Sequence, residues 1–210
     1  SGGFLIVNSS SNVISVAGDW THTGGTFNAD GGSIVLNGTT PQTVACLTDF
    51  NDLTINNPSG VIMNSDVTVN GVLSLTNGIL TTGNFSLVLG PIASVARTNG
   101  HVNGNLAKNV PTGAAALSFE IGGPVYYTPV DVAFGNVTTP GNLTAEVFAE
   151  DHFEIFISPI DSAKNVNRFW SFTSSSIVFD NYSATFHFDP ANVDAGSNTN
   201  NFTVGRFDIG

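Results

Sequence analysis

The sequence predicts an all-β protein, a β-solenoid followed by an antiparallel β-sandwich, on the strength of three observations. No stretch keeps apolar residues at the i, i+3, i+4 and i+7 spacing of a helix over three turns. Short runs in which apolar and polar residues alternate recur along the whole chain, as in half-buried strands. Asn-Gly pairs, which favour sharp turns, separate many of these runs, at residues 37–38, 70–71, 77–78, 99–100 and 103–104.

The solenoid is predicted over residues 1–109, where the apolar runs are only three to five residues long. Residues 16–36 align with residues 69–89 at an offset of about 53, with shorter echoes at roughly 18 to 25. Such a repeat favours coils that lay short strands on parallel faces, although Asn-Gly turns also suit a meander of hairpins. We expect the alternate apolar side chains to form the core: Val16, Ile34, Leu36, Leu53, Ile55, Val67, Val69, Leu73, Leu75, Leu87 and Leu89.

The sandwich is predicted over residues 110–210, with the two modules meeting near residues 106–112. Beyond this boundary the alternating runs are longer and richer in aromatic residues, and Gly, Pro or Asn separates them. The expected strands are residues 117–121, 128–134, 143–148, 168–172, 184–188 and 202–207.

The charge balance excludes two classes of partner. Charged residues make up 10% of the chain, and the net charge is −11. Nucleic acids and anionic membranes both require a basic surface, so we expect neither as a partner. No apolar run approaches the ~20 residues of a membrane span, and a single cysteine, Cys46, excludes an internal disulfide. Few charges and 23 glycines favour a durable exported protein, located outside the cell or on its surface.

Several segments carry a family resemblance. Residues 18–28 read GDWTHTGGTFN, residues 35–39 read VLNGT, residues 42–44 read QTV and residues 50–57 read FNDLTINN. Residues 67–90 read VTVNGVLSLTNGILTTGNFSLVLG, and residues 165–170 read NVNRFW. These segments resemble motifs of repeat-rich surface proteins that Bacteroidota and related bacteria secrete. The resemblance implies a large exported protein without an assigned role. It also implies that a tail following the stretch 202–208 is missing or was removed.

No set of residues predicts catalysis, so we expect no enzyme. The histidines lie at 22, 101, 152 and 187, without the short spacing of a metal-binding pair. There is no Gly-x-Ser-x-Gly motif, and nothing in the sequence pairs Cys46 with a histidine. Glu150 and Glu154 belong to the densest acidic group, which suits glycoside hydrolysis only inside a cleft. We expect that group to lie in a solvated loop.

Calcium is the one cofactor that the sequence suggests. Asp189, Asn192 and Asp194 place oxygen atoms at i, i+3 and i+5 before Gly196, as in a loose calcium loop. The segment lacks the regular alternation and the closing Glu of an EF-hand. An ordinary turn rich in Asp and Asn is therefore the alternative.

The favoured function is structural: an extracellular subunit of a filament or surface layer, or an adhesin scaffold. Neither end of the solenoid shows a charged capping helix, and residues 4–7 form an apolar strand at the start of the chain. Such a strand completes the sheet of a neighbour, and a head-to-tail contact of this kind propagates into a homopolymer. The expected contact residues are Phe4, Leu5, Ile6, Val7, Phe202, Val204 and Phe207.

Two binding functions remain as alternatives. In a carbohydrate-binding module, Trp20, Tyr126 and Tyr127 would stack on the rings of surface glycans, whereas Trp170 is expected in the core. In an ice-binding solenoid, threonines would form regular ranks on one flat face. Thr21, Thr23 and Thr26 do not recur in this way.

Overall fold

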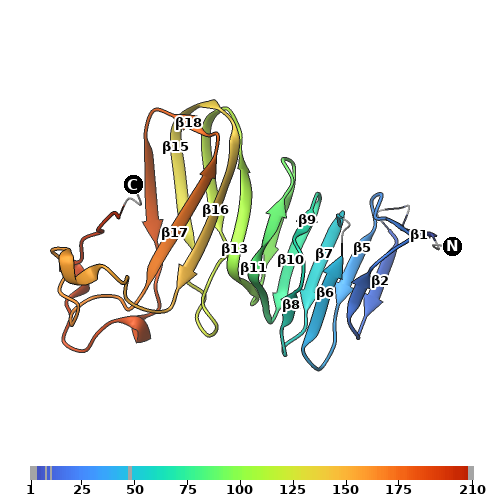
Figure 1. The fold of residues 1–210 in the computed structure, drawn as a ribbon, viewed down its shortest axis with the longest axis horizontal. Coiled ribbons are helices and arrows are strands. Elements are labelled where there is room, and N and C mark those ends of the chain that lie inside the picture. The colour runs from blue at the N-terminus through green and yellow to red at the C-terminus, as the bar shows by residue number, and fades with distance from the viewer. Residues whose placement is uncertain (1–3, 8, 10, 47–48, 208–210) are drawn as a thin grey trace.

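The computed structural model describes residues 4–7, 9, 11–46 and 49–207, which form an elongated all-β molecule (Figure 1). A stack of short strands occupies the N-terminal end, and longer strands occupy the other. No α-helix occurs in the described part of the chain. Its helical elements are three 3-10 turns: η1 (Ile155–Ile157), η2 (Pro190–Asn192) and η3 (Thr199–Asn201).

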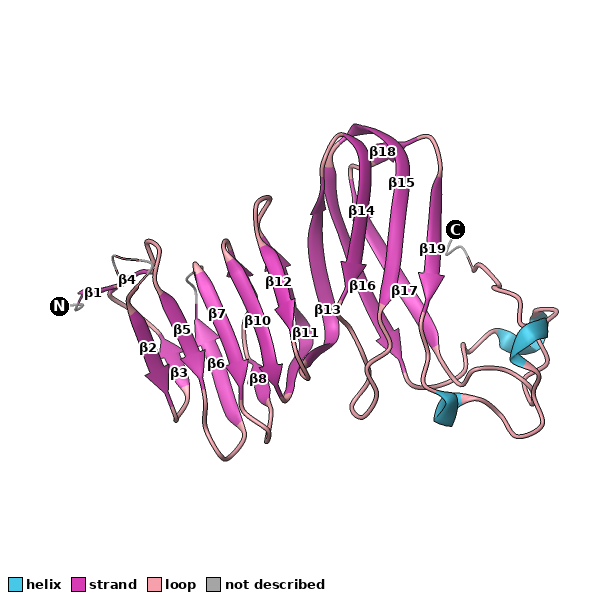
Figure 2. Cartoon of the chain, turned by 180° about the vertical axis from the view of Figure 1, so that it is seen from behind, coloured by secondary structure: helices cyan, strands magenta, loops and turns pink. Residues whose placement is uncertain are grey.

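The N-terminal stack has three faces, and the first face is a five-stranded sheet in the order β12-β10-β7-β5-β2 (Figure 2). All neighbouring strands in it pair in parallel, as expected when a chain returns to the same face once per coil. Its strands are β2 (Val13–Val16), β5 (Ser33–Leu36), β7 (Asp52–Asn56), β10 (Val72–Asn77) and β12 (Ser94–Arg97).

The other two faces also consist of parallel pairs. The second face contains β3 (Trp20–His22), β6 (Gln42–Cys46) and β8 (Val61–Met63). The third contains β1 (Phe4–Ile6), β4 (Thr26–Asn28) and β9 (Val67–Val69). Two longer strands, β11 (Ile79–Leu89) and β13 (His101–Val110), run across both faces, because β11 pairs first with β8 and then with β9.

The coil repeat is about 20 residues, which confirms the solenoid-like stacking. On the first face Ile14 pairs with Ile34, and Ile34 pairs with Leu53, which are steps of 20 and 19 residues. The shorter echoes in the sequence match this step, whereas the offset of 53 is wrong as a coil repeat. It aligned the first-face strand β5 with residues 86–89 on the third face. Strands with the same alternation and the same turns are interchangeable in such an alignment.

The inward side chains form one continuous hydrophobic core. The core prediction is confirmed for ten residues, each at most 3% exposed: Ile34, Leu36, Leu53, Ile55, Val67, Val69, Leu73, Leu75, Leu87 and Leu89. Val16 is only partly buried and packs against this core. It lies on β2, the end strand of the first face, and therefore has a neighbouring coil on one side only.

Carboxylates and amides join successive coils at their corners. Asp19, Asp52 and Asp66 each accept a hydrogen bond from a backbone N–H of the next coil, 20 to 24 residues further along the chain. Inside the stack, Gln42 and Asn57 are at most 1% exposed, and Asn57 Nδ2 donates to Gln42 Oε1 at 2.9 Å. Three of the 16 acidic residues thus join neighbouring coils.

Replacing Asn57 with alanine is expected to destabilise the fold by about 2–3 kcal/mol, because buried hydrogen-bonding groups lose their partners. Asn57 Nδ2 also donates to Thr40 O, and Asn57 Oδ1 accepts from Ser59 N. Urea unfolding monitored by circular dichroism measures the loss. Asn64→Ala at an exposed position is the matched control and should change stability by less than about 0.5 kcal/mol. Equal effects of the two changes would contradict a role for the amide network.

The strand pairing changes from parallel to antiparallel at β13. Beside it lie β16 (Gly141–Phe148) and then β17 (Phe169–Ser175), both in antiparallel pairing. A second antiparallel sheet contains β14 (Gly113–Phe119), β15 (Val130–Thr139), β18 (Val178–Phe179) and β19 (Tyr182–Phe186). The predicted module boundary at 109/110 falls at the end of β13, a strand shared by the parallel and the antiparallel parts.

The two antiparallel sheets contact each other through aromatic residues. The rings of Trp170 on β17 and Phe186 on β19 lie 5.0 Å apart, and Trp170 Nε1 donates to Thr128 O. The strand expected at residues 202–207 is wrong, since this segment follows η3 without strand pairing. Its aromatic side chains instead contact other rings. The ring centroids of Phe202 and Phe188 lie 6.1 Å apart, and those of Phe207 and His152 lie 4.8 Å apart.

Candidate functional site

The first strands of the described stack have one unpaired side each. In the described part of the chain, β1, β2 and β3 are end strands that pair on one side only, with β4, β5 and β6. Apolar side chains lie beside these free edges: Phe4 is 80% exposed, Leu5 46%, Ile6 54% and Val13 57%. These four residues and the free sides of β1, β2 and β3 form what we call the N-terminal edge. Unpaired strand edges with apolar side chains readily accept another strand.

Val7 differs from the other predicted contact residues. It is 2% exposed and its N–H donates to Asn28 O, so it already belongs to the core of its own chain. The prediction that Val7 is free to contact a neighbour is therefore wrong. The bond also fixes the orientation of β1. Because backbone groups alternate along a strand, the N–H of Ile6 points away from β4, toward the open side.

A second apolar surface lies at the opposite end of the molecule, beyond the long strands (Figure 1). We call it the C-terminal patch, and its side chains are between 44% and 77% exposed: Phe153, Phe156, Ile157, Val204 and Phe207. The ring of His152 holds part of it together, at 4.4 Å from Phe153 and 4.8 Å from Phe207. Val204 and Phe207 were predicted contacts and are exposed here, whereas Phe202 is half-buried.

The three residues predicted to stack on sugars have different environments. Trp20 is 9% exposed and packs against Phe27 at 5.1 Å and Phe50 at 5.7 Å, so it belongs to the core. The Arg97 guanidinium lies 3.4 Å from the centroid of the Tyr127 ring and covers that face. Of the three residues, Tyr126 is the one that lines a pocket, and Arg168 lines the same pocket. Burial of Trp20 removes it as a stacking residue.

The predicted calcium ligands are engaged with protein donors. Asp189 accepts from Ala191 N, and Asn192 Oδ1 accepts from Arg168 Nε at 2.7 Å. Asp194 accepts from Asn165 N and from Asn167 Nδ2, and these bonds hold its pKa below the ordinary value. Among the described residues no group of three or more His, Cys, Asp or Glu is placed to hold a metal ion. These bonds are typical of a turn rich in Asp and Asn, and calcium binding at this segment stays a prediction.

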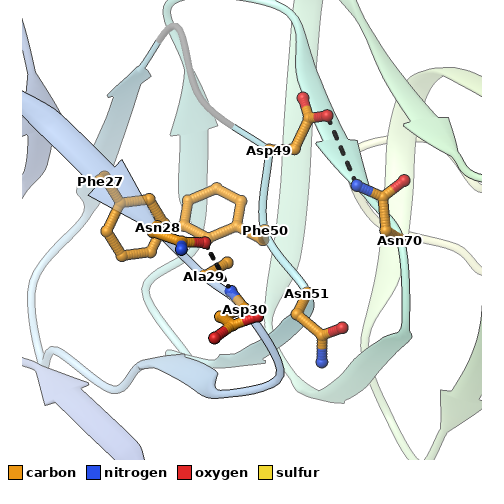
Figure 3. Close-up of a pocket in the computed structure, with 8 residues that line it drawn as sticks. All are labelled: Phe27, Asn28, Ala29, Asp30, Asp49, Phe50, Asn51 and Asn70. Carbon is orange, nitrogen blue, oxygen red and sulfur yellow. Dashed lines mark hydrogen bonds between the residues drawn. The ribbon is translucent and has the colours of Figure 1, made fainter. Parts of the chain in front are cut away.

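A groove of about 480 Å³ opens on the third face of the stack (Figure 3). Phe27 and Phe50 form its floor, and five oxygen-bearing side chains surround it: Asn28, Asp30, Asp49, Asn51 and Asn70. Asn28 Oδ1 accepts from Asp30 N at 3.1 Å, and Asn70 Nδ2 donates to Asp49 Oδ2 at 3.4 Å. The first bond closes a turn within residues 28–30, and the second joins two neighbouring coils.

Ser118, Asp131 and His187 form the nearest approach to a catalytic triad. The Ser118 hydroxyl donates to one Asp131 oxygen, and His187 Nε2 lies 2.7 Å from the other. The Ser118 hydrogen bond and His187 together lower the pKa of the Asp131 carboxyl. A serine hydrolase needs the histidine between the serine and the aspartate. Here the aspartate occupies the middle, so this imidazole is not placed to accept the proton of Ser118.

The outward residues of the first face form a mixed row. The strand register aligns them as Ser15, Val35, Thr54, Ser74 and Ala96. One threonine in five positions is not the regular array that ice binding requires. This face argues against the ice-binding alternative.

Fold and surfaces together define an all-β protein with a three-faced, solenoid-like stack, whose first described strands pair on one side only. No family model, no curated protein and no solved structure matches the chain. In the residues that the structure describes, no helix has the length and apolar character needed to cross a membrane.

Proposed function

We propose that this chain is an extracellular structural subunit, of a filament, a surface layer or an adhesin scaffold, that joins its copies head-to-tail. The carrying observation is the N-terminal edge, with its free strand sides and its exposed Phe4, Leu5 and Ile6. The C-terminal patch at the far end supplies an apolar surface for the same contact. We further propose that the two antiparallel sheets form a sandwich, which separates these two surfaces by the length of the molecule.

The energetics require more than β1 alone. Covering the exposed parts of Phe4, Leu5 and Ile6 contributes about 3–5 kcal/mol, taking about 1.5–3 kcal/mol for a fully buried side chain. Association costs at least about 4 kcal/mol in lost freedom. Val13 and the free backbone groups of β2 and β3 must therefore also take part. The proposed contact is the whole N-terminal edge.

Assembly is expected to strengthen with salt. The chain carries a net charge of −11, so copies repel one another at low ionic strength, while the proposed contact is apolar. Raising NaCl from about 20 to 500 mM shortens the screening length several-fold and removes this repulsion. Sedimentation velocity and negative-stain microscopy of the purified chain should show larger assemblies at high salt. Assemblies that dissolve as salt rises would contradict an apolar contact.

A further inference from the structure

Arg168 is a buried cation without a carboxylate partner. It is 8% exposed, and no Asp or Glu in the described part of the chain lies within ion-pair distance of it. Its Nε donates to Asn192 Oδ1 at 2.7 Å. Nη1 has no hydrogen-bond partner among the described residues. Burial lowers the pKa of the guanidinium, and the nearby charge of Asp189 opposes this effect only in part.

This guanidinium lines a pocket of about 250 Å³. A short apolar loop with Pro124, Val125 and Tyr126 also lines it, and Ala149 and Ala191 continue the apolar lining. The guanidinium carbon lies 5.8 Å from the centroid of the Tyr126 ring. The lining thus combines apolar and aromatic side chains with a cation.

Two amide side chains complete the lining. Asn192 must turn its oxygen to Arg168, because a guanidinium only donates, and its Nδ2 is left as a further donor. Asn167 Nδ2 donates to Asp194 Oδ1 and to Asn192 O, which leaves its own Oδ1 as an acceptor. The pocket therefore combines a buried cation with both kinds of hydrogen-bonding group.

We propose that this pocket binds a hexuronate, a sugar ring that carries a carboxylate. The planar fork of a guanidinium matches a carboxylate, and burial without a counter-ion makes an anionic partner favourable. Sulfate and phosphate lack an apolar part for the wall of Pro124, Val125 and Tyr126. A sugar ring presents C–H groups to an aromatic face and hydroxyls to the amides of Asn167 and Asn192. This site is independent of the N-terminal edge and does not rest on the proposed assembly.

Isothermal titration of the full chain tests the proposal. The probes are a galacturonate trimer, its methyl ester, acetate and a glutamate-containing tripeptide. The uronate trimer should bind, and the ester and acetate should bind at least about tenfold more weakly, as expected for loss of a charge-assisted pair or of the ring contacts. Equal affinity for acetate would refute the sugar, and tighter binding of the peptide would identify a protein carboxylate as the ligand instead.

Variants locate the site. Arg168→Gln and, separately, Tyr126→Leu should each weaken uronate binding by at least about tenfold. Lys164→Gln removes an exposed cation from the same loop region and is the matched control, with unchanged affinity. Thermal unfolding of each variant shows whether it is folded, and the Tyr126 variant keeps the test valid if Arg168→Gln is not. Unchanged binding in a folded variant at either position, or no uronate binding by the parent chain, overturns the proposal.

Discussion

In the proposed assembly, Ile6→Pro should leave the chain as folded monomers. The Val7 N–H bonds to Asn28 O, so the neighbouring Ile6 N–H points to the free side of β1. Proline removes this outward donor, and its ring obstructs a strand that approaches from the same side. Proline is tolerated at an edge position whose N–H faces solvent, so the pairing of β1 with β4 is kept. Sedimentation velocity at high salt measures the loss of assembly, and circular dichroism shows whether the variant keeps its fold.

Ile6→Ala is the control for the nature of the contact. It keeps the outward N–H and removes most of a side chain that is 54% exposed. If backbone pairing joins the subunits, Ile6→Ala should assemble more weakly but still assemble, whereas Ile6→Pro should not. A deletion for the same purpose has to end at residue 6, because Val7 belongs to the core. Assemblies of unchanged size from Ile6→Pro would show that β1 is not the connector.

The sequence predicted the stack well, because its coils depend on a local pattern. Each inward residue, such as Leu53 or Leu73, is two positions from the next, and the same alternation recurs about 20 residues later. The predicted offset of 53 residues is wrong for the same reason. β5 and the second part of β11 have the same alternation of apolar and polar residues, although they lie on different faces. Segment 202–207 alternates as well, but a strand also needs a free edge to pair with, and alternation carries no information about that edge.

The candidate sites were harder to predict. The apolar run of Phe4, Leu5 and Ile6 predicts a strand, whereas burial of Val7 depends on contacts with the next coil. Arg168 belongs to segment 165–170, which indicates a family resemblance but does not predict a binding site. Its lack of a carboxylate depends on which loops meet around it. The one signal in the sequence is an arginine at the start of the expected strand 168–172, in a chain with only five Lys and Arg residues.

Phe50→Ala is expected to have the largest effect on stability, about 3–5 kcal/mol for a fully buried phenylalanine. Phe50 is 0% exposed, and its ring lies 5.7 Å from Trp20 and 6.0 Å from Phe27. Those two residues lie on β3 and β4, in the coil that begins with β2, and Phe50 belongs to the next coil. In a stacked protein each coil contacts only its neighbours, so the cavity weakens the junction between these two coils most.

The N-terminal coil should therefore open before the rest of the stack. Hydrogen exchange of the variant should accelerate at residues 13–28 more than at β10 and β11, and urea unfolding should begin at lower concentration. Ile92→Ala, at a residue 90% exposed and outside both proposed contact surfaces, is the control and should change stability by less than about 0.5 kcal/mol. Opening of the first coil also removes the N-terminal edge, so Phe50→Ala should impair assembly although residue 50 is buried. Uniform acceleration of exchange across the stack would contradict the coil-by-coil account, because it would mean that the stack opens as one unit.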